Sequence, residues 1–342
     1  MRAVVYRETG DTSVLRLVER PVPDPRPGEV RVRVRVSGVN PTDWKTRSGL
    51  TQRGAFSEVV PNQDGAGVVD GVGEGVEELS VGQPVWVFEA QYGRPGGTAQ
   101  EYVCLPARNV VPLPAGAALD LGAALGVPFL TAHRCLTVLE GGPVSLAPEA
   151  LAGRVVLVAG GAGAVGNAAI QLARWSGASV LTTVSSPEKA RLALAAGADH
   201  AVDYRTEDAA AAIRAYAPQG IDLVVEVAPA VDSALDAAVL APGGTIAVYA
   251  NNGGASANVE IRPLMALNAR YQFVLVYTVP AAAKERALQD VARAVAEGAI
   301  GVGAEAGLPL HRYPLERTAE AHAAVENGAV GKVLIDLDAQ RA

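Results

Sequence analysis

The chain has 342 residues, of which 49% are hydrophobic and 19% charged, and its formal net charge is −7. At about 150 residues per domain this length predicts about two domains, and the apolar content excludes a disordered or collagen-like chain. Because the acidic balance creates no general field for a phosphate backbone or an anionic lipid, we expect no nucleic acid and no membrane partner.

Cysteine usage and apolar runs bear on the compartment. The two cysteines, Cys104 and Cys135, form no Cys-x-x-Cys pair, so the sequence contains neither a disulfide framework nor a zinc knuckle. The longest stretch without polar side chains, 155–166, is far shorter than the roughly 20 residues that span a bilayer. The start, MRAVVYRETG, lacks the features of an export signal. We therefore expect a cytoplasmic protein.

The first 125 residues are rich in valine, glycine and proline. Their short alternating runs are broken by turn signals roughly every 8 to 12 residues, which predicts a small all-β domain. In Arg31–Val36, RVRVRV, arginine alternates with valine and predicts a strand with one buried face. A basic binding stripe is the alternative for these arginines.

From about Leu130 strands alternate with helices, which predicts a parallel sheet covered on both faces. The expected strands are 154–159, 179–184, 201–203, 221–227, 245–249 and 271–278, and the expected helices are 130–139, 166–175, 187–196, 209–216, 232–240 and 281–297. The tail from Leu308 to Leu337 contains a last strand, and we expect it to return to the first domain.

A glycine-rich turn, AGGAGAVG, lies between the first strand of this series and its helix. Glycines at such a turn allow a tight bend and close approach to a pyrophosphate, whose charge meets the free N–H groups of the following helix. Gly160, Gly163 and Gly166 have the spacing G-x-x-G-x-x-G, one residue away from the commoner G-x-G-x-x-G. A plain helix cap is the alternative, but the alternating strands and helices favour a dinucleotide site.

The end of the second strand of the series indicates which dinucleotide is bound. NAD-binding proteins usually place Asp or Glu there on the ribose hydroxyls, whereas this sequence has Thr183-Val184-Ser185. The hydroxyl of Ser185, with Lys189 and Tyr204 nearby in sequence, suits the additional phosphate of NADP. In the alternative interpretation Lys189 belongs to the solvated face of the next helix.

Several ordered motifs together connect this chain to a family. They are SGVNPTDWKTRSG (37–49), PNQDGAGVV (61–69), GGTAQEYV (96–103), GVPFLTAHRCL (126–136), AGGAGAVG (159–166) and GKVLIDL (331–337). The chain resembles the medium-chain dehydrogenase/reductases, and within them the zinc-free quinone oxidoreductases of the zeta-crystallin type.

The resemblance covers nearly the entire chain and implies an α/β fold. In this fold a Rossmann domain, a doubly wound parallel sheet, is inserted in a GroES-like β-barrel catalytic domain, and the active site lies in the cleft between them. We expect the GroES-like domain over 1–127 and 266–342 and the Rossmann domain over 128–265.

Zinc-dependent members of the superfamily carry an early cysteine and a Gly-His-Glu motif. Here the corresponding places hold Asn40 and Asn62-Gln63-Asp64. A zinc site needs three or four Cys, His or carboxylate ligands, and the four histidines of the chain all lie outside these motifs. We therefore expect no metal and assign the histidines no role.

The resemblance also implies a set of residues around the dinucleotide. Those at the nicotinamide half are Asn40, Thr131, Asn251, Asn252, Val276, Tyr277, Thr278 and Lys332. Those at the pyrophosphate are Gly163, Ala164 and Val165, in the turn that also contains Gly160 and Gly166, and those at the adenosine phosphate are Ser185, Lys189 and Tyr204. A simple turn before Gly253 is the alternative for Asn251 and Asn252.

Without zinc there is no Lewis acid to polarise an alcohol, so we expect hydride transfer to an acceptor that is already electron-poor. The candidate catalytic residues are Asn40, Lys45 and Asp64. Lys45 follows Trp44, where the family often has a tyrosine, and it either bonds a carbonyl or is a surface lysine or phosphate contact. For Asp64 a structural carboxylate that caps backbone N–H groups is the favoured interpretation.

The expected activity is that of an NADPH-dependent quinone oxidoreductase acting on a quinone or conjugated carbonyl. We expect a homodimer formed through the edge strand near 271–279, as the resemblance implies, and a pocket shaped by the loops 49–57, 88–97 and 139–151. One alternative is an NADPH-dependent enoyl or alkenal double-bond reductase. A second is a non-catalytic NADPH-binding regulatory protein.

Overall fold

The computed structural model describes residues 1–51, 54 and 56–337, which form two compact units. The first unit comprises Met1–Val127 and Leu310–Ala342, and the second comprises Pro128–Pro309. The boundary at residue 127 agrees with expectation, and it falls at Pro128 inside the helix α2 (Leu119–Leu136). The second boundary differs, because residues 266–309 belong to the second unit and not to the first.

In the first unit the described residues form a sheet with the order β14–β15–β3–β4–β5–β7, and β6 also pairs with β3. The bounds are β3 (Glu29–Val39), β4 (Asp64–Val72), β5 (Pro84–Val87), β6 (Tyr102–Pro106), β7 (Val110–Pro112), β14 (Leu310–Pro314) and β15 (Lys332–Asp336). A separate pair is formed by β1 (Arg2–Val5) and β2 (Arg16–Glu19), and the helices are α1 (Pro41–Ser48) and α9 (Thr318–Glu326).

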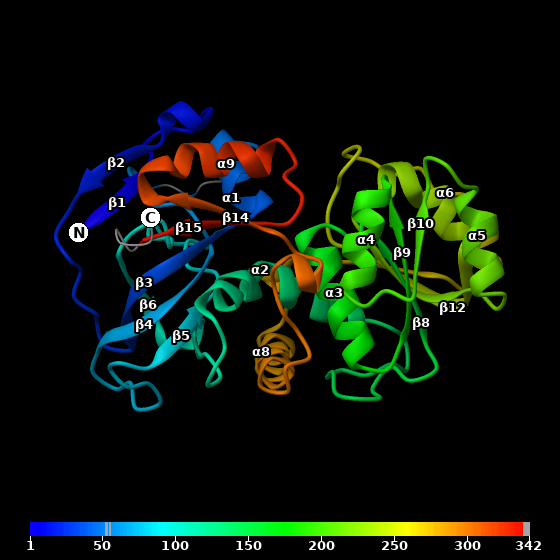
Figure 1. Cartoon of the computed structure of the whole chain (residues 1–342), viewed down its shortest axis with the longest axis horizontal. Coiled ribbons are helices and arrows are strands. Elements are labelled where there is room, and N and C mark those ends of the chain that lie inside the picture. Colours follow the sequence, from blue (N-terminus) through cyan, green and yellow to red (C-terminus); the bar gives the residue numbers. More distant parts are fainter. Residues whose placement is uncertain (52–53, 55, 338–342) are drawn as a thin grey trace. The chain divides into compact units, whose positions relative to one another are not determined.

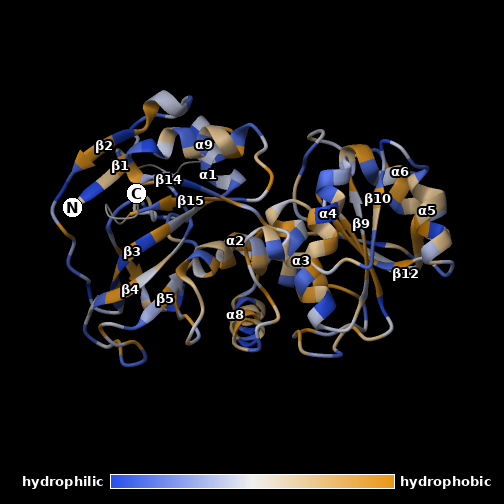
Figure 2. Ribbon diagram, viewed as in Figure 1, coloured by the Kyte–Doolittle hydropathy of each residue, from blue (hydrophilic) through white to orange (hydrophobic). Residues whose placement is uncertain are grey.

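The strand β3 has one buried face, as the alternation of arginine and valine predicts. Val30, Val32, Val34 and Val36 are buried in the core, whereas the arginines between them are at least partly exposed. The alternation can be followed along β3 in Figure 2. β15 runs antiparallel to β3, with Val333 opposite Val39, so the tail does return to the first unit.

The second unit contains a parallel sheet with the order β10–β9–β8–β11–β12–β13. The strands are β8 (Val155–Ala159), β9 (Ser179–Val184), β10 (His200–Asp203), β11 (Ile221–Glu226), β12 (Leu240–Val248) and β13 (Arg270–Phe273). The helices are α3 (Ala164–Trp175), α4 (Pro187–Ala195), α5 (Ala209–Tyr216), α6 (Pro229–Val239), α7 (Ile261–Ala266) and α8 (Ala281–Ala296).

This strand order is that of a doubly wound Rossmann sheet. From β8 the chain first adds strands on one side of the sheet, β9 and β10, and then returns to add β11, β12 and β13 on the other side. Figure 1 shows α3 and α4 on one side of the sheet and α5 and α6 on the other. The strand expected at 271–278 ends early, because its neighbour β12 ends at Val248 opposite Phe273. Val276–Thr278 form a 3-10 turn instead. Among the described residues no helix has the length and apolarity needed to cross a membrane.

Candidate functional site

The glycine-rich turn lies between β8 and α3 in the second unit, beside the point where the strand order reverses. Gly160 has a φ of +70°, and a Cβ on Gly166 would lie 2.5 Å from the Gly160 carbonyl oxygen. Gly163 is exposed, and a Cβ there would find no atom closer than 3.4 Å. A Cβ on Gly161 would likewise lie 2.2 Å from the Thr182 Oγ1. The turn therefore needs glycine at three positions and leaves Gly163 open in front of the helix.

The N-terminus of α3 presents backbone N–H groups at Ala164, Val165 and Gly166, which have no acceptor within the helix. These groups and the positive end of the helix dipole form a site for an anion. The geometry fits the pyrophosphate of a dinucleotide. The five residues predicted for the pyrophosphate turn all lie in this turn and the first turn of α3.

The residues predicted for the adenosine phosphate also lie together in the second unit. The Lys189 Nζ donates a hydrogen bond to the Ser185 Oγ at 2.9 Å, and both side chains are half-buried. Tyr204 is 52% exposed, and its backbone N–H donates to the carbonyl of Val184, the last residue of β9. The Lys189 ammonium and the Ser185 hydroxyl thus lie together directly after β9, with the backbone of Tyr204 beside the end of that strand, and the ammonium and hydroxyl are donors that fit a phosphate.

A pocket of about 450 Å³ lies at the carboxyl ends of β12 and β13. Its lining includes Asn251 and Thr278, two of the predicted residues. Asn252 belongs to the turn beside it, where its N–H donates to the Val227 carbonyl before Gly253 with a φ of +83°. The asparagines therefore form a turn, and Asn251 also lines a pocket. Their contact with a nicotinamide stays a prediction.

The remaining predicted residues of the second unit differ in accessibility. Val276 and Thr131 are each 5% exposed, whereas Tyr277 is half-buried and Thr278 exposed. The Thr278 hydroxyl donates to the Leu275 carbonyl.

Polar side chains form a buried cluster in the first unit, which we call the Lys332 cluster and define as Lys332, Asn40, Asp64 and Asp43. The Lys332 ammonium donates to the Asn40 Oδ1 at 2.7 Å, and the Asn40 Nδ2 donates to the Asp64 Oδ2 at 2.7 Å. The Asn40 backbone N–H donates to the Asp43 carboxyl at 2.7 Å. All four residues are at most 3% exposed.

Asp64 also accepts the backbone N–H of Val127, at 3.0 and 2.9 Å to its two oxygens. Val127 lies in α2 directly before Pro128, which has no N–H. The Asp64 carboxylate therefore caps one backbone N–H, that of Val127, as the structural interpretation expects. A Cβ on Gly126 would lie 2.1 Å from the Asp64 Oδ1, so only glycine allows α2 to approach this carboxylate.

Burial dominates the electrostatics of the Lys332 cluster. It lowers the pKa of Lys332, against the opposing effect of the nearby Asp64 and Asp43 carboxylates. It raises the pKa of Asp64, whereas Lys332, Asn40 and the Val127 N–H act in the other direction. Burial and the neighbouring Asp64 together raise the pKa of Asp43 to about 8. One ammonium therefore faces two carboxyl groups whose charged forms burial disfavours.

The residues at the positions of the zinc ligands do not form a donor set for zinc. Asn40 offers only an amide, whose oxygen already accepts from an ammonium. The Gln63 amide is paired with Gln91, since the Gln63 Nε2 donates to the Gln91 Oε1 and the Gln91 N–H donates to the Gln63 Oε1, both at 3.1 Å. No group of three or more His, Cys, Asp or Glu side chains within residues 1–51, 54 and 56–337 is arranged to hold a metal ion.

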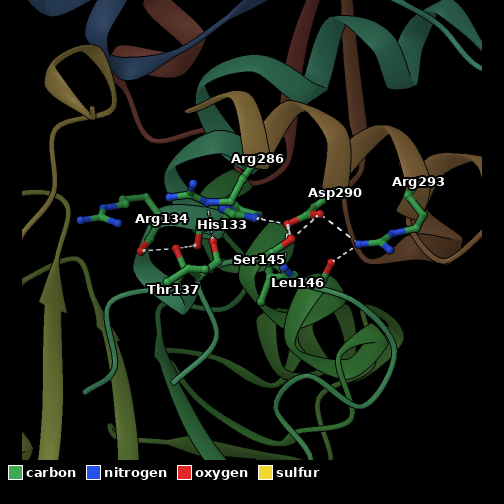
Figure 3. A network of polar contacts seen from close by, with 9 residues as sticks. His133, Arg134, Thr137, Ser145, Leu146, Arg286, Asp290 and Arg293 are labelled. Atoms are coloured by element: carbon green, nitrogen blue, oxygen red, sulfur yellow. Dashed lines mark hydrogen bonds and ion pairs between the residues drawn. The ribbon is translucent and has the colours of Figure 1, made fainter. Parts of the chain in front are cut away.

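Two of the loops expected to shape the pocket are held by hydrogen bonds. The loop 88–97 is held by the pairing of its residue Gln91 with Gln63. The loop 139–151 is held in the second unit by Asp290 of α8, as Figure 3 shows. The Asp290 carboxylate accepts from the His133 Nε2 at 2.8 Å, the Ser145 Oγ at 2.7 Å and the Leu146 N–H at 2.6 Å. These hydrogen bonds outweigh burial and lower the pKa of Asp290. The loop 49–57 contains residues 52, 53 and 55, which lie outside the described residues.

Lys45 lies apart from the Lys332 cluster in its contacts. Its ammonium is over the Trp44 ring, 5.9 Å from the centroid, and the side chain is half-buried. The described residues include no hydrogen bond that connects Lys45 to Asn40 or Asp64. A catalytic role for Lys45 stays a prediction.

Comparison with known proteins now identifies the family. The family model described as zinc-binding dehydrogenase matches residues 164–293, and the one described as alcohol dehydrogenase GroES-like domain matches residues 26–115. The chain is 32% identical to the quinone oxidoreductase of Homo sapiens over 339 residues, which cover 98% of this chain and 97% of the relative. The chain belongs to the quinone oxidoreductase-like family of the medium-chain dehydrogenase/reductase superfamily.

Solved structures agree with this assignment. An NAD-dependent alcohol dehydrogenase superposes with a TM-score of 0.86 at 30% identity, covering 99% of this chain and 100% of the other. A mycobacterial protein solved in complex with NADPH superposes with a TM-score of 0.82 at 30% identity, covering 98% of this chain and 100% of the other. The expectations of a Rossmann sheet, a GroES-like domain and an oxidoreductase of this superfamily are confirmed.

Four residues that hold these polar groups in place were not predicted from the sequence: Asp43, Gln91, Asp290 and His322. A signal existed for Asp43, because an acidic residue three positions after Asn40 is typical of a helix N-terminus whose first N–H groups need acceptors. For His322 no local pattern exists, because its partner Asn62 is 260 residues away in the chain.

Proposed function

We propose that this protein is an NADPH-dependent oxidoreductase that transfers a hydride to a quinone or conjugated carbonyl without zinc. The observation that carries the proposal is the Lys332 cluster, in which an amide held by an ammonium and a carboxylate stands at the position of a zinc ligand. The human relative named quinone oxidoreductase supports the class of acceptor.

The residues of the chain would bind and orient the dinucleotide and the acceptor. The glycine-rich turn and the N-terminus of α3 would hold the pyrophosphate, and the bound NADPH would supply the hydride. Asn40 carries two amide N–H groups, of which one donates to Asp64. We assign the second to the carbonyl of the acceptor, because Lys332 and Asp64 prevent the amide from rotating and so preorganise the donor.

The preference for NADPH rests on Ser185 and Lys189, since their ammonium and hydroxyl are donors for a phosphate. The mycobacterial protein solved with NADPH supports this choice. The structure named as an NAD-dependent alcohol dehydrogenase favours NADH as the second candidate.

The first experiment follows NADPH and NADH oxidation at 340 nm against a panel of quinones and enones. We expect turnover of quinones with NADPH preferred. Lys189→Ala should raise the KM for NADPH about tenfold or more and leave the KM for NADH unchanged, whereas Arg191→Ala on the exposed side of α4 should change neither. Faster turnover of enones would indicate a double-bond reductase. Tight NADPH binding without turnover on any acceptor would indicate a non-catalytic binding protein.

We also propose that the protein forms a homodimer through β13, which ends the parallel sheet. Phe273 is 72% exposed and Leu275 56%, an apolar edge that a second copy would cover. Light scattering should give the mass of a dimer for the wild type and of a monomer for Phe273→Lys. A cytoplasmic location is part of the same proposal, and the free thiols of Cys104 and Cys135 support it.

A further inference from the structure

A chain of hydrogen bonds in the first unit leads from α9 to the first residue of β4. The His322 Nε2 lies 2.9 Å from the Asn62 Oδ1, and the Asn62 Nδ2 donates to the Ser37 Oγ at 2.9 Å. The Ser37 and Thr98 hydroxyl oxygens are 2.7 Å apart, and the Thr98 hydroxyl donates to the Asp64 carbonyl at 2.6 Å. All five residues are buried without measurable exposure.

Counting the available hydrogens shows which group donates in each of these hydrogen bonds. Each hydroxyl has one O–H, and that of Thr98 is used on the Asp64 carbonyl. Ser37 must therefore donate to Thr98, and it accepts from the Asn62 amide. The Asn62 oxygen then needs a donor, which only a proton on the His322 Nε2 supplies.

His322 is a neutral donor in this arrangement. Burial, to which the nearby Arg47 cation adds, lowers its pKa to about 3. Its Nδ1 has no hydrogen-bond partner among the described residues, as expected when the single proton is on Nε2.

Asn62 has a backbone conformation that explains why it needs two partners. Its φ is +79°, a left-handed value that is uncommon for residues other than glycine, although asparagine tolerates it better than most. The carbonyl of Asn62 accepts the Thr98 N–H at 3.0 Å, so the residue is held at its backbone as well as its side chain. Asn62 directly precedes Gln63 and Asp64, and its conformation sets the direction in which β4 begins.

We propose that His322 is a positioning residue for the Lys332 cluster: it acts through Asn62, Ser37 and Thr98 to hold Asp64 where its carboxylate meets Asn40 and the Val127 N–H. The proposal rests on the proposed function, in which Asn40 presents a fixed donor to the acceptor. Among the described residues no hydrogen bond joins His322 to a member of the cluster, so its effect is transmitted through the backbone of residues 62–64.

The test compares His322→Leu, which removes the donor, with His322→Gln, which can place an N–H near the position of the His322 Nε2. A misplacement of about 1 Å costs on the order of 100-fold in rate, so His322→Leu should lower kcat with a quinone about 10- to 100-fold. Its KM for NADPH should stay within about twofold, because the glycine-rich turn belongs to the second unit. His322→Gln should recover most of kcat.

A second pair of variants tests the path through Asn62. Asn62→Gly and Asn62→Ala lose the same side-chain hydrogen bonds, but glycine adopts a φ of +79° freely. Asn62→Ala should therefore lower kcat more. The double variant His322→Leu/Asn62→Gly should be no slower than the slower single variant, because coupled residues are not additive.

The outcomes separate this proposal from the function on which it rests. Wild-type kcat in folded His322→Leu, measured well below its melting temperature, would overturn the positioning role. If the wild type itself oxidises no NADPH, the proposed function fails, and a crystal structure of His322→Leu decides the positioning role. Retention of the 2.7 Å contact between Lys332 and Asn40 would then overturn it, and loss of that contact would support it.

Discussion

Two buried carboxyl groups in the second unit should make its stability depend on pH. Glu226, the last residue of β11, and Asp236 of α6 are 0% and 1% exposed, and the interaction between their carboxyl groups favours a proton shared by the two. The Glu226 Oε1 also accepts the Ala228 N–H. Two further ionisable groups, Asp232 and Tyr271, lie close enough to interact with this pair.

Burial, assisted by Asp232, raises the pKa of Glu226 from its ordinary 4.5 to about 7, against the hydrogen bond from Ala228. The folded protein therefore binds more protons than the unfolded chain in this window, and stability falls as the pH rises through it. At about 1.4 kcal/mol per pH unit, the free energy of unfolding should drop by about 3 kcal/mol between pH 4.5 and 7 because of this group.

Urea unfolding of the wild type and of Glu226→Gln at pH 5, 6, 7 and 8 measures the effect. The glutamine amide can donate to Asp236 without a shared proton, so this variant should lack the decrease that Glu226 causes. Hydrogen exchange at the Ala228 amide gives a local readout, and Glu188→Gln on exposed α4 is the matched control. Parallel pH profiles for the wild type and Glu226→Gln would show that the reasoning is wrong.

Two further predictions concern the second unit. Gly166→Ala should weaken NADPH binding at least about tenfold in calorimetry, because its Cβ would lie 2.5 Å from the Gly160 oxygen. The control is Gly301→Ala, outside the turn, whose Cβ would lie no closer than 3.4 Å to another atom and which should bind nearly as the wild type does; equal affinities for the two variants would contradict the role of the turn. Asp290→Asn should lower stability by about 2 kcal/mol at pH 7, since it weakens charge-assisted bonds such as that from His133. Because the pKa of Asp290 is lowered from its ordinary 3.8, the difference from the wild type should persist from pH 7 to about pH 5 and shrink as the pH falls below about 4. A difference in thermal unfolding that stays constant when the pH is lowered further, to about 2.5, would contradict it.

The fold could be predicted wherever the information is local. The alternation in Arg31–Val36 identified a half-buried strand, and the eight residues from Ala159 to Gly166 identified the turn between β8 and α3. The error at residues 266–309 has a different origin. β13 joins the parallel sheet by pairing with β12, and nothing within 270–273 specifies that neighbour.

The candidate site in the first unit was only partly predictable, because it is assembled from distant segments. Asn40 and Lys332 are separated by 292 residues, and Asn62 and His322 by 260. The motifs named Asn40, Asp64 and Lys332 one by one, but only the structure shows that they share hydrogen bonds. His322 was missed because its role comes from a partner far away in the chain, whereas Asp43 could have been found from its place three residues after Asn40.

The Lys332 cluster and the hydrogen bonds that lead from His322 to Asp64 also explain how Asn62-Gln63-Asp64 can stand in place of a Gly-His-Glu motif without loss of the fold. A left-handed residue at position 62 suits glycine, and Asn62 adopts the same conformation with support from His322 and Ser37. The Gln63 amide is used by Gln91. Each replacement in the motif is therefore matched by a partner elsewhere in the unit, so that restoring glycine or histidine at one position alone would leave a buried polar group without its hydrogen bond.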